Sequence, residues 1–258
     1  MLWKINQDIF DLTKQYSTQL DNFAIQFDRK GRHHISGISP MFYDEHDFQD
    51  TSNLLIIGLN PSLSDAEYRQ QNGDSIFSWK SLSSLKMVDL CYSVSKIADF
   101  QQNQIYSDKA HPYFKVIQKH ISQLIVPKKI VHYDLYSFRA TNSKICLGFK
   151  DDPVLIDYHK QSVKRLTSML ETGFKTILIL NKKVSELLRD ELNLSKNSNC
   201  TLKIRKSLYG VYNVKSLPET EKIPYTSFIF FKQLSSGANF SNIEIEKLKE
   251  NLKEHFIS

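Results

Sequence analysis

Short, uninterrupted apolar runs alternate along the chain with stretches whose apolar residues recur at helical spacing. The clearest run is LLIIG at residues 54–58, which is followed by a segment containing Asn60 and Pro61. A continuous apolar run that ends in glycine, asparagine and proline is typical of a buried parallel strand that leads into a turn. Similar runs predict three more strands, at Lys129–Leu135, Thr176–Leu180 and Thr226–Phe231.

Between and around these runs, the spacing of the apolar residues predicts helices. Residues 4–28 predict one or two amphipathic helices, and residues 241–256 predict a charged helix with Glu and Lys pairs at i, i+4. The polar segment Asn193–Asn199 is predicted to be a loop. The remaining predicted helices are Met87–Phe100, His111–Ile125, Val154–Leu170 and Lys183–Leu192.

The alternation of strands and helices predicts an α/β fold. We expect a three-layer sandwich in which helices flank a central, mostly parallel sheet of four strands. The 258 residues suffice for one large core, and no repeat or low-complexity linker divides them. The expected organisation is a single domain over residues 1–258, with a helical extension at 1–50, a core at 51–240 and a final helix at 241–258.

Composition and charge limit the classes of binding partner and the location that we expect for the protein. The chain is 41% hydrophobic and carries a formal net charge of +6, which favours approach to a polyanion such as DNA, although many soluble proteins are mildly basic. Neither the N-terminus nor any later stretch has the apolar length of a signal peptide or a membrane span, so we expect a cytoplasmic protein. The chain has three cysteines, which is an odd number, and they lack the paired spacing of zinc sites or disulfides. We therefore expect reduced thiols.

The turn after the first strand is the leading candidate for chemistry, because ligands of open α/β sheets bind beyond the carboxyl ends of strands. Gly58-Leu59-Asn60-Pro61-Ser62 presents Asn60, whose side chain both donates and accepts hydrogen bonds, at the strand tip. Taken alone, the same residues are equally compatible with an ordinary Asn-Pro turn.

This turn resembles the first motif of the uracil-DNA glycosylase superfamily, which reads Gly-x-Asn-Pro-Gly in the mismatch-specific and single-strand-selective branches. The resemblance implies a base-excising enzyme of uracil-DNA glycosylase-like fold in which Asn60 orients the attacking water. It also places Ser62 where the uracil-specific branch carries a bulky tyrosine against C5 of the pyrimidine.

Further segments resemble the family in the same order along the chain. Phe77, within GDSIFS, follows at about the distance of the ring that stacks on the extruded base, although a core position is an equal alternative. In HYDLYSFRATNSK, Asp134 stands where the family has a base-reading Asn, and Asn142 matches the second Asn of that segment. Arg139 and Lys144 of the same segment are candidates for DNA contacts. The alternative for Asp134 is a buried acid paired with Arg139 or a lysine.

The segment after the last predicted strand is similar to the second family motif, His-Pro-Ser-Pro or a variant, which clamps DNA phosphate and assists departure of the base. Gln233 and Leu234 replace the His-Pro pair, so the motif is degenerate here. The resemblance assigns Gln233 a catalytic role and DNA contacts to Lys232, Ser235 and Ser236.

The substrate is suggested by Asp134 and Ser62 together. An ionised carboxylate only accepts hydrogen bonds, so it suits the exocyclic amino group of cytosine and repels the carbonyl oxygens of uracil. A small residue at position 62 leaves room for a substituent at C5. Both features fit a 5-substituted cytosine, such as the glucosylated hydroxymethylcytosine of phage DNA that antiphage glycosylases of this superfamily remove.

Other functions remain open on the sequence. One alternative is a repair glycosylase for uracil or damaged pyrimidines, and another is a non-catalytic nucleic-acid-binding module on the same fold, suggested by Gln233. The cluster Tyr43–Asp47 is better explained as a solvated acidic turn than as a metal site. His132 and His159 have no assigned role. We expect a monomer that binds DNA and uses no metal or organic cofactor.

Overall fold

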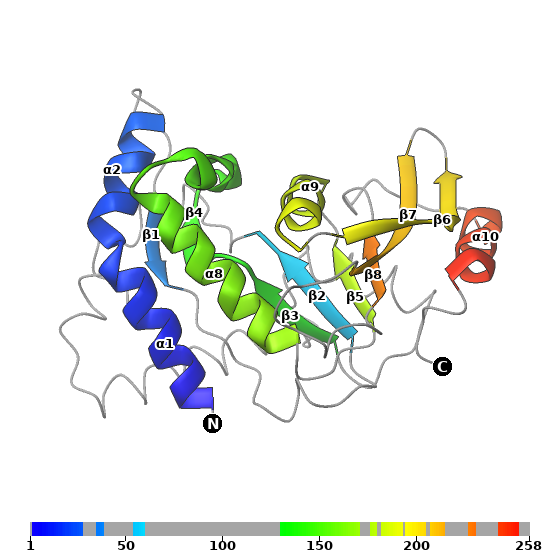
Figure 1. Ribbon diagram of the computed structural model, residues 1–258, viewed down its shortest axis with the longest axis horizontal. Coiled ribbons are helices and arrows are strands. Elements are labelled where there is room, and N and C mark those ends of the chain that lie inside the picture. Colours follow the sequence, from blue (N-terminus) through cyan, green and yellow to red (C-terminus); the bar gives the residue numbers. More distant parts are fainter. Residues whose placement is uncertain are drawn as a thin grey trace. The chain divides into compact units, whose positions relative to one another are not determined.

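The chain folds as an α/β protein. The computed structural model describes residues 2–27, 35–38, 54–59, 130–170, 176–179, 182–192, 194–204, 207–214, 227–230 and 242–252 (Figure 1). In chain order the described elements are α1 (Leu2–Gln15), α2 (Ser17–Phe27), β1 (Ile35–Ile38), β2 (Leu54–Gly58), β3 (Ile130–Asp134), β4 (Phe138–Ala140), the 3-10 helix η1 (Ser143–Asp151), α8 (Leu155–Leu170), β5 (Thr176–Ile179), α9 (Lys182–Glu191), β6 (Leu194–Ile204), β7 (Ser207–Val214), β8 (Ser227–Phe230) and α10 (Asn242–Leu252). The predicted helices Met87–Phe100 and His111–Ile125 lie outside the described residues.

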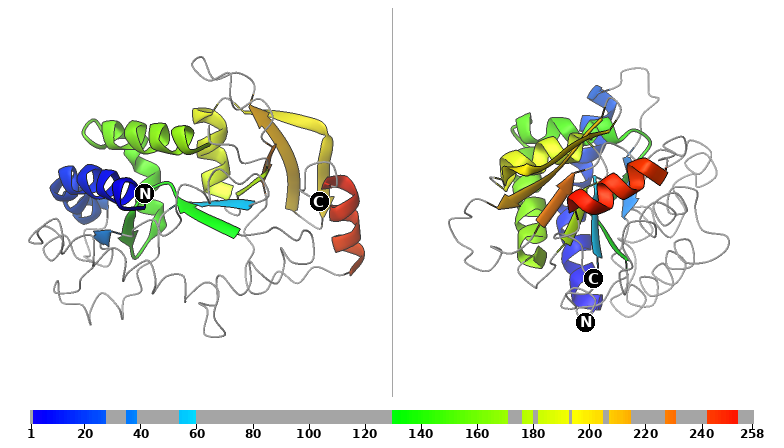
Figure 2. Two further views of the ribbon diagram at one scale, coloured as in Figure 1. Left: turned by 90° about the horizontal axis from the view of Figure 1, so that it is seen from below. Right: turned by 90° about the vertical axis from the view of Figure 1, so that its right-hand side faces the viewer.

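A parallel core of three strands, β2, β5 and β8, runs through the main sheet. Leu55 of β2 pairs with Ile177 of β5, and Leu178 of β5 pairs with Ile229 of β8. All residues of β2 are buried, which explains why its sequence is continuously apolar rather than alternating. Helices flank this sheet; α9 contacts β5 and β6, and α10 contacts β6 (Figures 1 and 2).

The four strands predicted from apolar runs are neighbours in a six-stranded sheet of order β3-β2-β5-β8-β7-β6. The prediction of a loop at Asn193–Asn199 is wrong, because residues 194–199 belong to β6, which pairs antiparallel with β7. β6 is one of the two edge strands of the described sheet, and a polar sequence is common in edge strands. Its register with β7 also shifts between Lys196 and Thr201.

The chain forms two compact units, each assembled from three segments. Unit 1 comprises Met1–Asp44, Leu59–Gln102 and Asp134–Leu166, and unit 2 comprises Glu45–Gly58, Asn103–Tyr133 and Thr167–Ser258. Within unit 1, α2 contacts both β1 and η1, and β1 pairs antiparallel with β4. The expected division into a single domain with terminal extensions stays a prediction.

The two N-terminal helices confirm the amphipathic pattern predicted for residues 4–28. Ile9, Thr13, Tyr16 and Leu20 are buried at the three- and four-residue spacing that forms one stripe on a helix. The hydroxyl of buried Thr13 donates to the carbonyl oxygen of Ile9 at 2.8 Å, so its polar atom has a partner inside the helix. No helix among the described residues is long and apolar enough to cross a membrane.

The start of α8 is determined by Asp152 and Pro153. The Oδ1 atom of Asp152 accepts hydrogen bonds from the backbone N–H groups of Val154 and Leu155, both at 2.9 Å. An aspartate cap followed by proline is the preferred beginning of a helix, because the cap satisfies exposed N–H groups and proline has none. The predicted helix Val154–Leu170 is therefore confirmed to within one residue.

An aromatic cluster forms the interior of unit 1. Its rings come from the junction of α1 and α2, from α2, β4, η1 and α8, and from the segment between β3 and β4, with centroid separations of 5.2 to 6.2 Å within the cluster. The members are Tyr16, Phe23, Tyr136, Phe138, Phe149, Tyr158 and His159. Edge-on and offset ring pairs of this kind each add about 0.5–1.5 kcal/mol beyond simple burial.

Gly148 of η1 lies so close to Phe23 of α2 that it has no room for a side chain. A Cβ atom at Gly148 would lie 2.8 Å from the Cζ atom of Phe23, whose ring packs edge-on against Phe149. We expect Gly148→Ala to lower the free energy of unfolding by about 1 kcal/mol, because the Phe23 ring must move away from Phe149. Urea denaturation measures this loss.

Phe23→Ala provides the control for Gly148→Ala. In the Phe23→Ala background the added methyl group has no ring to displace, so Gly148→Ala should cost much less there than in the wild-type background. Equal losses in the two backgrounds would contradict the steric explanation.

Candidate functional site

The carboxyl end of β2 is where a ligand site is expected from the topology. Among the described strands, β3 follows β2 in the chain and lies on one side of it, whereas β5 lies on the other side. Open α/β sheets bind ligands outside the carboxyl ends of strands at such a switch in strand order. Gly58 ends β2, buried Leu59 follows, and Asn60 is the next residue in the sequence.

A backbone hydrogen bond joins the segments that follow β2 and β3. The N–H of Tyr136 donates to the carbonyl oxygen of Leu59 at 2.9 Å. Asp134 is the last residue of β3, two positions before Tyr136. The bond therefore connects the segment that begins with Asp134 to the residue that directly precedes Asn60. Asp134–Ser137, which we call the β3–β4 loop, is thus joined through its backbone to Leu59.

The side chain of Tyr136 anchors the β3–β4 loop in the interior of unit 1. Its ring is fully buried and packs against Phe138, Phe149, Tyr158 and His159. Its hydroxyl forms a 2.7 Å hydrogen bond with Nδ1 of His159, and the imidazole tautomer decides which group donates. His159 is only 2% exposed, so this polar pair lies within the apolar core.

A second side chain of the β3–β4 loop also contacts α8. The Nη2 atom of Arg165 donates to the hydroxyl oxygen of Ser137 at 3.3 Å, and Ser137 is 4% exposed. Adjacent residues of this loop therefore both bond to α8, Tyr136 through His159 and Ser137 through Arg165. Asp134, at the other end of the loop, is half-buried.

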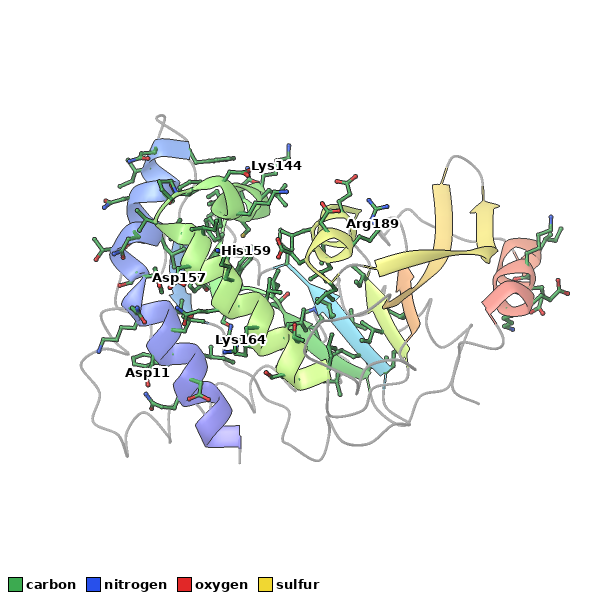
Figure 3. The ribbon with its side chains drawn as sticks, viewed as in Figure 1. Asp11, Lys144, Asp157, His159, Lys164 and Arg189 are labelled. Atoms are coloured by element: carbon green, nitrogen blue, oxygen red, sulfur yellow. The ribbon has the colours of Figure 1, made fainter. Side chains whose placement is uncertain are left out.

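The candidate DNA-contacting residues follow the β3–β4 loop closely. Arg139 is the middle residue of β4 and pairs with Ser36 of β1; it is half-buried between two fully buried neighbours, as strand alternation requires. Lys144 is exposed on η1 (Figure 3). Both cations belong to unit 1, as does Asp134.

Asn142 has a structural use in addition to its predicted role in binding the base. It is the N-cap of η1, and its Oδ1 atom accepts the backbone N–H of Lys144 at 2.9 Å. This bond satisfies a helix-terminal donor that would otherwise lack an intrahelical acceptor. The base contact of Asn142 stays a prediction.

Several predicted site residues lie outside the described residues. They comprise the candidate water-positioning and C5-side residues of the first motif, the candidate stacking ring, and all candidates of the second motif. They are Asn60, Ser62, Phe77, Lys232, Gln233, Ser235 and Ser236. The described candidates are Asp134, Arg139, Asn142 and Lys144.

The electrostatic influence of Asp134 extends to Cys146 of η1. Cys146 is a fully buried free cysteine, and burial raises the pKa of its thiol well above the ordinary value, with a further contribution from the negative charge of Asp134. The thiol is therefore held in its protonated, unreactive form. Within the described part of the chain, no group of His, Cys, Asp and Glu side chains is arranged to hold a metal ion.

A second hydrogen-bonded cluster connects Tyr16, at the junction of α1 and α2, to α8 and does not involve the β3–β4 loop. The hydroxyl of Tyr16 donates to Oδ2 of Asp157, and Nε2 of Gln161 donates to the same oxygen at 2.6 Å. The hydrogen bond to Asp157, together with burial, raises the pKa of Tyr16 to about 12. The same bond, aided by Gln161, lowers the pKa of the Asp157 carboxyl. Figure 3 shows Asp157 and His159 on α8.

Tyr136, His159 and Arg165 are the residues that the sequence analysis missed. His159 falls on the buried stripe of α8 with Leu155, Ser162 and Leu166, so its position in the amphipathic pattern is a signal that it faces the core. The partnership with Tyr136 has no such signal, because the two residues are 23 positions apart and meet only in the folded chain.

Comparisons of the chain with protein-family models, curated proteins and solved structures found no match.

Acidification should reveal the contribution of Asp157 to stability. Because its pKa is lower in the folded protein than the ordinary 3.8, its charge stabilises the fold above that value, and the contribution is lost as the pH falls through the lowered pKa. Asp157→Asn, which keeps an acceptor oxygen, should therefore lower the melting temperature at neutral pH, and the difference should vanish in strong acid. Thermal unfolding over a range of pH measures both limits.

Asp151→Asn is the matched control for Asp157→Asn, because Asp151 is an exposed carboxylate at the end of η1. It removes the same charge without touching Tyr16, so its effect should be small at every pH. A melting difference for Asp157→Asn that is independent of pH, or that equals that of Asp151→Asn, would contradict the assigned role.

Proposed function

We propose that this protein is a monofunctional DNA glycosylase of uracil-DNA glycosylase-like fold that excises a flipped-out, 5-substituted cytosine and leaves an abasic site. The observation that carries the proposal is the hydrogen bond from Tyr136 N–H to the Leu59 carbonyl. It links the loop that begins at Asp134 to the residue before Asn60, and these are the two positions to which the motif resemblance assigns base reading and water positioning. The switch in strand order at β2 supports the same location.

The chemistry requires little from the protein beyond placement and electrostatics. The bond between C1′ of the sugar and N1 of the base breaks with its electron pair leaving on the base, and a water oxygen bonds to C1′. The proton that this water loses is balanced by the proton that the departed base takes up, so the products are the neutral base and an abasic site. Asn60 orients this water through its amide oxygen. An amide is a poor general base, so the rate depends on positioning and on stabilising the negative charge of the departing base.

Base selection in this proposal combines Asp134 with Ser62. The Asp134 carboxylate accepts the exocyclic amino group of cytosine, and such a contact supplies about 1–3 kcal/mol of discrimination. That is too little to spare the excess of ordinary cytosine, so selection also needs the C5 side of the pocket, where small Ser62 admits a substituent. Glucosylated hydroxymethylcytosine of phage DNA satisfies both conditions and gives the enzyme an antiphage role in the cytoplasm.

The other cationic, polar and aromatic candidates complete the proposal. Arg139 and Lys144 contact DNA phosphates, and the chain's net charge of +6 favours this approach. Phe77 stacks on the extruded base and Asn142 contributes its amide. Lys232, Ser235 and Ser236 bind phosphate in the second motif, where Gln233 assists base departure. Extrusion itself costs a few kcal/mol, which these contacts offset.

The decisive experiment measures abasic sites after incubation with three DNAs: one carrying glucosylated hydroxymethylcytosine, one unmodified and one carrying uracil. We expect excision from the glucosylated DNA alone. Asn60→Ala should reduce this excision by at least about 100-fold while DNA affinity stays unchanged, because Asn60 positions the water and does not hold the duplex. Excision from uracil DNA alone would favour a repair glycosylase. Binding without excision from any DNA would favour a non-catalytic module.

Asp134→Asn tests the base-reading role separately. An amide both donates and accepts, so it is compatible with uracil, which the carboxylate repels. The variant should gain uracil excision and lose excision of the modified cytosine, as measured on oligonucleotides with one target base each. Unchanged selectivity in a folded Asp134→Asn variant would show that Asp134 does not read the base.

A further inference from the structure

We propose that His159 and Arg165 of α8 are positioning residues for the candidate site, because they hold the β3–β4 loop, and with it Asp134, in one place relative to Leu59. The inference rests on the proposed glycosylase function and deepens it. Neither residue belongs to the motifs that suggested the family, and both act through the loop rather than on the base.

The first support is the number and spacing of the anchors. Tyr136 bonds to His159 at 2.7 Å and Ser137 bonds to Arg165 at 3.3 Å. His159 and Arg165 are six residues apart on one helix, which corresponds to roughly 9 Å along its axis. The Leu59 carbonyl supplies a third, backbone anchor. Two separated anchors on α8 resist tilting of the loop, which a single contact cannot do.

The second support is the burial of these anchors. Tyr136 is 0%, His159 2% and Ser137 4% exposed, so water does not replace a bond that breaks. A loop conformation that separates Tyr136 from His159 would leave polar atoms buried without their partners, at a cost of about 1–3 kcal/mol for each group. The aromatic neighbours of Tyr136 add a steric penalty, because its ring packs against Phe149 and Tyr158 with little space to move.

The third support is that the anchored residues of the loop lie between two candidate site residues in the chain. Asp134 precedes the anchored residues Tyr136 and Ser137, and Arg139 follows them in β4. A site that reads a base and orients a water needs its groups held within about 0.5 Å of the productive geometry. A displacement of about 1 Å can reduce the rate about 100-fold. Rigid attachment of the loop to α8 is therefore a catalytic requirement under the proposed function.

Tyr16 provides a matched comparison. Its hydroxyl also bonds to a side chain of α8, that of Asp157, and its ring also packs against Tyr158. Tyr16 lies at the junction of α1 and α2, outside the β3–β4 loop. Tyr136→Phe and Tyr16→Phe thus each remove a hydroxyl that bonds to a side chain of the same helix, and only Tyr136→Phe releases the loop.

The experiment measures two quantities for wild type, Tyr136→Phe, Arg165→Lys and Tyr16→Phe. The first is hydrogen exchange of the residue 136 amide, which reports the Leu59 bond without DNA. The second is the single-turnover excision rate at saturating enzyme on glucosylated DNA. We expect Tyr136→Phe and Arg165→Lys to exchange this amide about tenfold faster and to excise about tenfold more slowly, with unchanged DNA affinity. Tyr16→Phe should match wild type in both.

The possible outcomes separate this inference from the proposed function. An inactive wild type overturns the proposed function, and the amide exchange still decides whether α8 holds the loop. An active wild type with unchanged exchange and excision in Tyr136→Phe and Arg165→Lys overturns the inference alone. Equal losses of excision in Tyr136→Phe and Tyr16→Phe also overturn it, because they would reflect the general stability of α8 packing.

Discussion

Tyr136 is the residue on which the arrangement of the candidate site depends. Its ring fills the aromatic interior of unit 1, its hydroxyl bonds to His159, and its backbone N–H bonds to the Leu59 carbonyl. Each of these contacts is buried, so each is costly to break. Together they fix the chain between β3 and β4 in relation to Leu59. The position of Asp134 relative to Leu59 follows from this constraint.

The same constraint gives the proposed chemistry a physical basis. Hydrolysis of a glycosidic bond with an amide in place of a general base relies on pre-arranged groups, because an amide cannot compensate for poor placement by removing a proton. A loop anchored to α8 through Tyr136 and Ser137 supplies that rigidity from the core. The polar pair Tyr136–His159 thereby connects the packing of unit 1 to the proposed selection of a base by Asp134.

The sequence predicted those elements whose signals are local. The strands β2, β5 and β8 lie in mostly apolar runs, β3 lies in an apolar run interrupted by His132, and α1, α2, α8, α9 and α10 have helical periodicity. The antiparallel strands were not predicted. β6 has a polar sequence because it is an edge strand, and its conformation depends on pairing with β7 rather than on its own residues. Short β4 exists through pairing with β1, which is about one hundred residues away in the chain.

The candidate site was predictable only in part. Asp134, Arg139 and Lys144 were candidates because their segment, HYDLYSFRATNSK, resembles a segment of the family. Nothing in the local sequence indicated that Asn142 caps η1, since the 3-10 helix itself was not predicted. The anchoring bonds of Tyr136 and Ser137 to α8 join residues 23 and 28 positions apart, and such pairs are determined by tertiary packing.

The most direct test of this account is a crystal structure of the Asn60→Ala variant bound to duplex DNA that carries glucosylated hydroxymethylcytosine. The account predicts an extruded cytosine whose exocyclic amino group lies about 2.9 Å from the Asp134 carboxylate, with the Tyr136–Leu59 bond intact. A modified base that stays stacked in the duplex, or an extruded base bound away from an Asp134 that is instead paired with Arg139, would contradict it.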